Sequence, residues 1–91
     1  MIIFIPTPLR PFAAGNDAVE IDAPTVAQAL EALTQSHPDL RKHLFTPEGK
    51  LRAFVNLYLN DEDVRYLPEK EATAVTAADT LSIIPSIAGG N

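Results

Sequence analysis

Alternation of hydrophobic and polar residues predicts most of the strands in this chain. The predicted strands cover residues 2–5, 18–22, 51–60, 64–66 and 80–84. β-Branched and aromatic residues are frequent in these stretches, as is typical of strands. Turn-forming residues separate the first strand from the second and the third from the fourth, which predicts two hairpins.

The longest predicted strand has two different faces. Val55, Leu57 and Leu59 lie on one side, whereas Phe54 and Tyr58 alternate with them on the other side. Because the first set is entirely aliphatic, we expect it to pack against a helix and to form the centre of the hydrophobic core.

A helical period replaces the alternation between the second and third strands. Thr25 and Gln28 have the spacing of a capping box, in which the threonine hydroxyl accepts a hydrogen bond from the first turn. An apolar stripe follows at helical spacing, formed by Val26, Ala29, Leu30 and Leu33. The helix should end near Ser36, because Pro38 disfavours helical geometry at the residue before it. Pro38 also suits the first turn of a short second helix, expected at residues 38–44.

Two segments are predicted to be irregular. Three prolines restrict residues 6–12 to a sheet edge or an extended loop. Residues 67–76 have no regular period, and we expect only a single helical turn there, around residues 69–71.

The order of the elements predicts the fold. One amphipathic helix can cover one face of a four- or five-stranded sheet. If both hairpins share that sheet, the first strand should lie parallel to the last one, with the helix as a right-handed crossover. The predicted fold is therefore an α+β β-grasp, in which a mixed sheet packs on one main helix and a short helix.

The last predicted strand passes directly into a segment without periodicity. Pro85 ends the ladder because it has no N–H to donate, and small residues then lead to Gly89 and Gly90. We therefore expect a domain at residues 1–85 and a flexible tail at residues 86–91. From Pro85 to Gly90 the extended chain reaches at most about 20 Å, and glycine backbone fits a channel that side chains would block. A frayed terminus would give the same pattern.

Composition and charge exclude several classes of function. The chain has 91 residues, no cysteine and a net charge of −5, which excludes thiolate chemistry and argues against a nucleic-acid partner. No apolar run approaches the roughly 20 residues of a membrane span. The apolar residues 2–5 are too few for a signal peptide and follow no basic segment, so we expect a cytoplasmic protein without a membrane partner.

No group of residues has the spacing of a catalytic or metal site. His37 and His43 are the two histidines, and a zinc site would need two further ligands on fixed elements. We expect both side chains to be solvated. The acidic residues 61–63 fall at a hairpin tip, where nothing desolvates them for acid–base chemistry. We therefore predict no bound metal or cofactor, and no enzymatic activity of the chain alone.

A hydrophobic patch is predicted on the side of the sheet without a helix. Phe54 and Tyr58 point to that side, and Ile84 should join them from the last strand. An exposed apolar patch on a small protein often binds a partner. Alternatively, residues 6–12 or 67–76 fold over the patch and cover it.

Three stretches of sequence carry a resemblance to a known family. They are the capping-box helix at residues 25–33, the run FVNLYLNDEDVR at residues 54–65, and residues 78–90, where a strand, a proline and Gly-Gly follow each other. Together they resemble the ThiS/MoaD sulfur-carrier family, whose members are ubiquitin-like β-grasp proteins. The middle run and the opening IPTPLRP at residues 5–11 are most similar to the CysO-type branch, which donates sulfur in cysteine synthesis.

The resemblance implies a role for Gly90. An E1-like, MoeB-type enzyme would adenylate the Gly90 carboxylate with ATP, while Ala88 and Gly89 occupy the channel of that enzyme. A sulfur donor would displace AMP and leave a thiocarboxylate. The thiocarboxylate would attack an acceptor on a pyridoxal-phosphate (PLP) enzyme of the cysteine-synthase type, and a JAMM-type zinc protease would cut the adduct after the second glycine.

Two positions depart from the family pattern. The chain continues to Asn91, so Gly90 has no free carboxylate until that residue is removed. We expect a JAMM-type protease to remove it, which makes Gly90 and Asn91 the processing site. Ala78 occupies a position where the family often has glycine, and this affects the geometry of a turn but not the chemistry.

Three functions are compatible with these features. The first is sulfur carriage, either for cysteine or a related compound or, as in the MoaD and ThiS branches, for molybdopterin or thiamine. The second is a ubiquitin-like modifier that is joined through Gly90 to lysines of other proteins. The third is a β-grasp binding module whose tail is inert.

Overall fold

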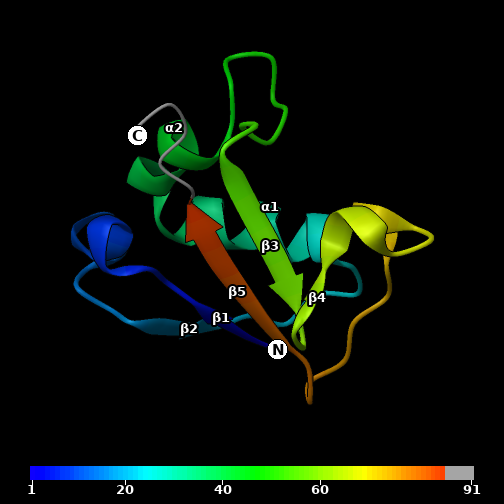
Figure 1. Cartoon of the computed structure of the whole chain (residues 1–91). Helices are drawn as coiled ribbons and strands as arrows, with labels where there is room; N and C mark the ends of the chain where they lie inside the picture. Colours follow the sequence, from blue (N-terminus) through cyan, green and yellow to red (C-terminus); the bar gives the residue numbers. More distant parts are fainter. Residues whose placement is uncertain (86–91) are drawn as a thin grey trace.

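The computed structural model describes residues 1–85, which form a mixed five-stranded sheet with one long helix on one face (Figure 1). The strand order is β2-β1-β5-β3-β4. The strands are β1 (Ile2–Phe4), β2 (Ala18–Glu20), β3 (Val55–Leu59), β4 (Glu62–Asp63) and β5 (Thr80–Pro85). This arrangement confirms the predicted α+β β-grasp.

The last strand, β5, lies at the centre of the sheet. It pairs in parallel with β1, where Ile3 is opposite Leu81, and in antiparallel with β3, where Leu57 is opposite Ile83. β2 and β4 form the edges as antiparallel partners of β1 and β3. The predicted parallel pairing of the first and last strands is confirmed. Because β5 has a neighbour on each side, hydrogen bonds hold it along both edges.

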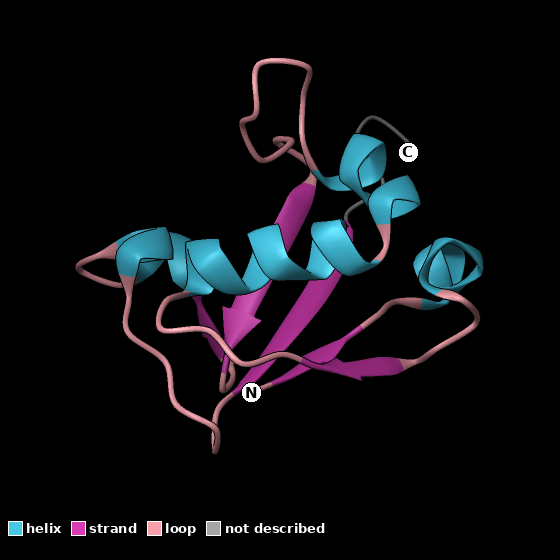
Figure 2. Cartoon of the chain, turned by 180° about the vertical axis from the view of Figure 1, so that it is seen from behind, coloured by secondary structure: helices cyan, strands magenta, loops and turns pink. Residues whose placement is uncertain are grey.

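The helix α1 (Val26–Ser36) crosses one face of the sheet (Figure 2). Its N-cap is Thr25, whose Oγ1 accepts a hydrogen bond from the Gln28 backbone N–H at 3.2 Å, as the capping box predicts. The predicted second helix is also present. It consists of the 3₁₀ turn η2 (Pro38–Leu40) followed by α2 (Arg41–Leu44).

The segment at residues 6–12 differs from the prediction. It was expected to be extended, but it forms most of the 3₁₀ helix η1 (Thr7–Ala13). Proline fixes φ near −65°, which is compatible with a 3₁₀ helix, so the prolines that prevent pairing in a sheet support this helix instead. Leu9 and Ala13 are buried on its inner side, and this burial favours the helical conformation over an extended loop.

The second hairpin is shorter than predicted. The strand expected at residues 51–60 begins only at Val55, and the strand expected at residues 64–66 is a 3₁₀ helix, η3 (Val64–Tyr66). Asp63 ends β4 and caps η3, because its Oδ1 accepts a hydrogen bond from the Arg65 N–H at 2.9 Å. This side-chain cap competes with continued pairing to β3. A further turn, η4 (Lys70–Ala72), confirms the helical turn predicted around residues 69–71.

The core lies between α1 and the inner face of the sheet. Val55, Leu57 and Leu59 are buried there, as predicted. The largest fully buried side chains are Ile3, Ile5, Val26, Leu30, Leu33, Leu40, Leu44 and Leu81. Within residues 1–85, no helix is long and apolar enough to cross a membrane.

Candidate functional site

The end of β5 is the point from which the predicted reactive tail starts. Leu81 and Ile83 are almost fully buried on the inner face, and Pro85 is the last residue of the ladder, opposite Val55 on β3. The strand is therefore fixed in position up to Pro85. The predicted tail at residues 86–91, with Ala88, Gly89, Gly90 and Asn91, lies outside the described residues.

Two of the three predicted patch residues meet on the outer face of the sheet. Tyr58 on β3 is opposite Ser82 of β5, and Ile84 is two residues further along β5. Such diagonal neighbours are about 7–8 Å apart, within reach of an aromatic side chain. Ile84 is 47% exposed and Tyr58 is partly exposed. The structure thus places these two side chains together, on the face opposite α1.

Phe54 occupies a different environment from the one predicted. It precedes β3 in a turn, and its partly buried ring packs against the core cluster. The alternation that would direct it outward does not apply, because the strand begins one residue later, at Val55. Phe54 therefore contributes less exposed surface to the outer face than the sequence suggested.

Phe4 belongs to the outer face and was not predicted there. It is 46% exposed and lies on β1, opposite Ser82 of β5. Phe4 and Tyr58 therefore flank Ser82 on the two neighbouring strands, and Ile84 lies two residues further along β5. We call Phe4, Tyr58 and Ile84 the outer-face patch. The alternation of Phe4 with the buried Ile3 was the available signal, combined with the parallel pairing of the first and last strands.

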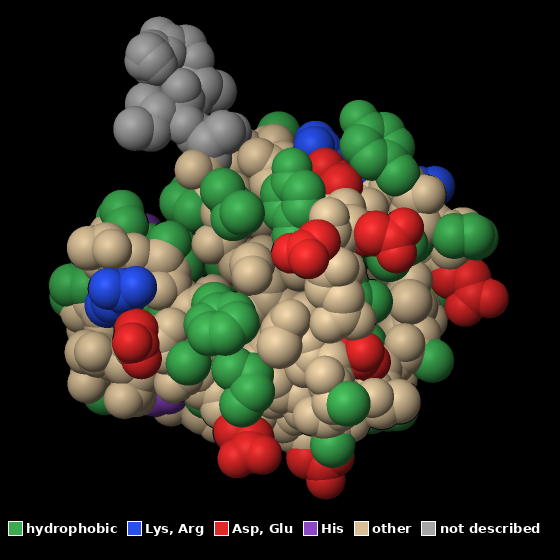
Figure 3. All heavy atoms as spheres, turned by 60° about the horizontal axis from the view of Figure 1, so that its bottom comes forward, with side chains coloured by type: hydrophobic (Ala, Val, Ile, Leu, Met, Phe, Trp, Pro, Cys, Tyr) green, Lys and Arg blue, Asp and Glu red, His purple; other side chains and the backbone are tan. Residues whose placement is uncertain are grey.

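The segments expected as a cover do not bury the outer-face patch. η1 packs against η2, and Leu67, from the other candidate segment, packs against the core cluster. Phe4 and Ile84 keep almost half of their surface exposed within the part of the chain that the structure describes. Figure 3 shows hydrophobic side chains standing between acidic ones on the surface that it presents. The outer face is therefore open to a partner.

The two histidines are not equivalent, and His43 differs from the prediction. Its ring stacks on Phe12, with the ring centres 4.1 Å apart and an angle of 27° between the planes. Its Nε2 is buried and has no hydrogen-bond partner among residues 1–85. The ring is thus part of the packing between η1 and α2, and its Nε2 is shielded from solvent although the residue is partly exposed. In the same described range, no three His, Cys, Asp or Glu residues are close enough to hold a metal ion.

Hydrogen bonds order the polar turn at the start of β5. Asn60 Nδ2 donates to Asp79 Oδ1 at 2.8 Å, and the Thr76 N–H donates to Asp79 Oδ2 at 2.7 Å. The hydrogen bond from the Asn60 side chain, and then that from the Thr76 backbone, lower the pKa of Asp79 below its ordinary value. These contacts stabilise the turn that leads into β5.

A capping ion pair occupies the other acidic turn. Arg65 Nη2 contacts Asp63 Oδ2 at 2.7 Å, and the hydrogen bond from the Arg65 side chain is the main cause that lowers the pKa of Asp63. The turn itself uses Asn60 and Asp61 with positive φ of 50° and 78°, which matches the tight two-residue turn that joins antiparallel strands. Asp61 therefore lies in the turn, as predicted, whereas Glu62 and Asp63 form β4.

A single crossover helix on a mixed sheet whose last strand is central defines the ubiquitin-like β-grasp class. A family model described as "ThiS family" matches residues 3–90 of the chain. The match spans nearly the whole chain, and the protein belongs to this family. The matched region includes Gly90 and ends before Asn91.

The curated relatives are small carrier or modifier proteins. The chain is 38% identical over 90 residues to the sulfur carrier protein CysO of Mycobacterium tuberculosis, with 97% of this chain and 96% of the relative covered. It is 36% identical over 80 residues to small archaeal modifier protein 1 of Haloferax volcanii, with 85% and 86% covered. By their names, the first relative is a sulfur carrier and the second is a modifier protein.

A solved structure of a relative gives the same fold. The crystal structure of the Amycolatopsis orientalis BexX/CysO complex contains a chain with a TM-score of 0.85 and 37% identity, and the match covers 98% of both chains. In that complex, a relative with this fold is bound to another protein.

Proposed function

We propose that this protein is a sulfur carrier of the CysO type, with Gly90 as the residue that carries sulfur. The proposal is carried by the family match, which extends through Gly90 and includes CysO relatives over nearly the whole chain. The described structure agrees with this role, because β5 is fixed up to Pro85 and four residues separate Pro85 from Gly90.

The chemistry requires an activated carboxylate. A carboxylate is a poor electrophile, since its oxygen is a poor leaving group. In the proposed reaction, an E1/MoeB-like enzyme joins the Gly90 carboxylate oxygen to the α-phosphate of ATP, with release of pyrophosphate. Sulfur from a donor then attacks the acyl carbon, the bond to AMP breaks, and Gly90 becomes a thiocarboxylate. Its anionic, polarisable sulfur attacks the acceptor, which we propose is held by a PLP-dependent enzyme.

Removal of Asn91 must precede this reaction, because Gly90 is otherwise joined to Asn91 by a peptide bond. We expect a JAMM-type zinc protease to cut between Gly90 and Asn91. Intact-mass measurement of the protein from its native cells should show a species that ends at Gly90. A population that always ends at Asn91 would contradict the proposed activation.

The decisive experiment uses the Asn91-deleted chain with its activating enzyme, ATP and sulfide. Mass spectrometry should show a gain equal to the mass difference between oxygen and sulfur. The chain that retains Asn91 is the matched control and should show no gain, since its Gly90 carbonyl is blocked by the peptide bond to Asn91. The absence of any gain in the Asn91-deleted chain would refute sulfur carriage.

The runner-up is protein modification through Gly90. It is favoured by the 36% identity to small archaeal modifier protein 1 of Haloferax volcanii. Both functions begin with adenylation, so the products distinguish them. A modifier would appear as a ladder of covalent adducts on other proteins in native cells, whereas a carrier would remain a free protein that gains and loses sulfur.

A further inference from the structure

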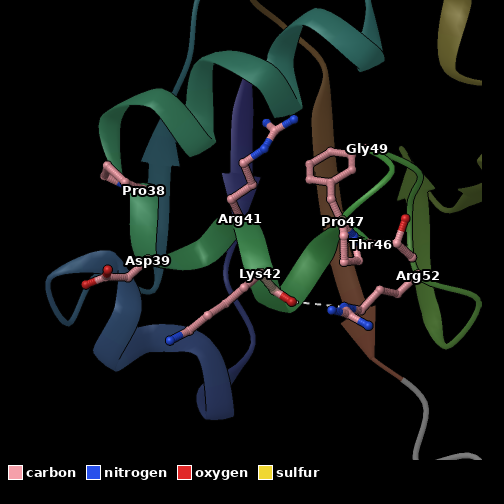
Figure 4. Close-up of a pocket in the computed structure, with 9 residues that line it drawn as sticks. Pro38, Asp39, Arg41, Lys42, Thr46, Pro47, Gly49 and Arg52 are labelled. Carbon is pink, nitrogen blue, oxygen red and sulfur yellow. Dashed lines mark hydrogen bonds between the residues drawn. The ribbon is translucent and has the colours of Figure 1, made fainter.

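One groove gathers positive charge on a protein that is acidic as a whole. The chain has 7 Lys and Arg residues against 12 Asp and Glu residues, but Arg41, Lys42 and Arg52 all line a single open groove of about 340 Å³ (Figure 4). Among the described residues that line it, Asp39 is the one acidic residue. These lining residues therefore have a formal charge of +2, opposite in sign to the chain.

The groove lies at the root of the C-terminal tail. Arg52 Nε donates to the Lys42 carbonyl at 2.9 Å, which joins the loop before β3 to α2. The Arg52 carbonyl accepts a hydrogen bond from the Val55 N–H at 3.0 Å, and Val55 is opposite Pro85. Three residues of extended chain span at most about 11 Å, so Arg52 lies within that distance of Val55. Pro85 is the cross-strand neighbour of Val55, about 5 Å further on. Figure 1 shows α2 beside the same end of β5.

Much of this positive charge is not neutralised within the protein. Among the described residues, Arg41 forms an ion pair with Glu31 at 3.4 Å, and its guanidinium also lies over the Phe45 ring. Lys42 and Arg52 form no ion pair with any carboxylate in residues 1–85. Lys42 is exposed, and Arg52 is partly exposed. These two side chains are therefore available to an external anion.

We propose that this groove docks carboxylates on the surface of the enzyme that receives the tail. The inference rests on the proposed function, because it requires a partner that accepts Gly90. If the tail enters the partner's channel in an extended form, a nucleotide joined to Gly90 lies about 17 Å beyond Pro85 and away from the groove. The rim of the partner's channel is the surface that meets the root of the tail. Arg and Lys near that rim would accelerate association with an acidic surface.

The test measures association of the Asn91-deleted chain with its activating enzyme at about 50 and 300 mM NaCl, where screening differs strongly. K42E and R52E should each slow association about ten-fold at low salt, and the difference should shrink at high salt. K70E is the matched control, because it makes the same charge change at an exposed lysine outside the groove lining. Thermal melts should show that all variants are folded.

The remaining outcomes separate this inference from the proposed function. If K42E and K70E slow association equally, net charge and not the groove is responsible, and the inference fails. If inorganic phosphate at matched ionic strength slows the unsubstituted chain to the rate of K42E and chloride does not, the groove is a phosphate site and the inference also fails. K42E should still gain sulfur at saturating enzyme. The absence of any gain in the unsubstituted Asn91-deleted chain would refute the proposed function itself.

Discussion

The two faces of the sheet differ in exposure and in residue type, and two adjacent isoleucines on β5 illustrate this. Ile83 points inward and is 3% exposed, whereas Ile84 points outward and is 47% exposed. Inward positions on β1, β3 and β5 are aliphatic throughout. Outward positions on the same strands mix Phe4, Tyr58 and Ile84 with Asn56 and Ser82. Burial alone explains the residue types on the inner face but not those on the outer face.

The outer face exposes more apolar surface than folding of the inner face requires. A strand that packs on one side commonly has polar residues on its solvent side. Here two aromatic side chains and one aliphatic side chain from three neighbouring strands meet around Ser82 instead. Contiguous apolar groups on a small protein are typical of a partner surface. We propose that the outer-face patch contributes to docking of the activating enzyme.

The largest expected effect is a loss of stability when a residue of the inner face is truncated. Ile83→Ala should lower the free energy of unfolding by about 2–5 kcal/mol, because it removes buried methyl groups and leaves a cavity. Ile84→Ala is the matched control, with the same chemical change one residue away on the exposed side, and should cost about 1 kcal/mol or less. Urea denaturation of both variants measures the contrast. Equal losses would contradict the assignment of the two faces.

A smaller effect is expected on the outer face, and it concerns binding. Tyr58→Asp should weaken binding to the activating enzyme by about 2 kcal/mol, or roughly 30-fold, because it places a charge in the outer-face patch. Calorimetry or surface-based binding with the Asn91-deleted chain measures the affinity, and a thermal melt checks the fold.

Tyr66→Asp provides the control for this substitution. Tyr66 is 81% exposed but lies on η3, outside the sheet. The Tyr66 variant should bind as the unsubstituted chain does. Unchanged affinity of the Tyr58 variant, or an equal loss in both variants, would exclude the outer-face patch as the docking surface.

The smallest effect is expected at the polar turn before β5. The pKa of Asp79 is lowered in the folded protein, mainly by the Asn60 side chain and then by the Thr76 backbone. Its charged form therefore stabilises the fold above the ordinary pKa of an aspartate, and this contribution is lost as pH falls through the lowered pKa. Asp79→Asn should make the decrease in unfolding free energy between about pH 5 and 2 less steep.

A series of denaturation curves across that pH range tests this expectation. Asp22→Asn is a suitable control, since Asp22 is exposed and its side chain makes no hydrogen bond among residues 1–85. The control should retain the pH dependence of the unsubstituted protein. If both substitutions reduce the pH dependence of the unfolding free energy equally, the reduction comes from net charge and not from the Asp79 hydrogen bonds.

Local periodicity predicted the secondary structure correctly in elements that bury one face and expose the other. The helix cap at Thr25 and the inward set on β3 followed from spacing. The parallel pairing of the first and last strands followed from the order of the elements. The predictions of secondary structure were wrong where side-chain hydrogen bonds or tertiary contacts compete with hydrogen bonding between strands. Asp63 caps η3 and so ends β4 early, and burial of Leu9 favours a 3₁₀ helix in a proline-rich segment.

The candidate site was predicted only in part. Tyr58 and Ile84 follow from alternation, but Phe54 depends on the residue at which β3 begins, and alternation does not specify strand ends. To predict Phe4 in the patch, one must know the register between β1 and β5. To predict the groove at Arg41, Lys42 and Arg52, one must know that the loop before β3 lies beside α2. Contacts between distant segments created both features, so no single stretch of sequence contains them. The role of Gly90 comes from the family resemblance and remains a proposal.

The central position of β5 also determines how the protein responds to force. Five residue pairs join this strand to β3 and three join it to β1. A pull on the carboxyl end acts along the strand, nearly at right angles to its hydrogen bonds, so the bonds share the load instead of opening one by one. An enzyme could therefore pull on the C-terminal end of the chain without unfolding the domain.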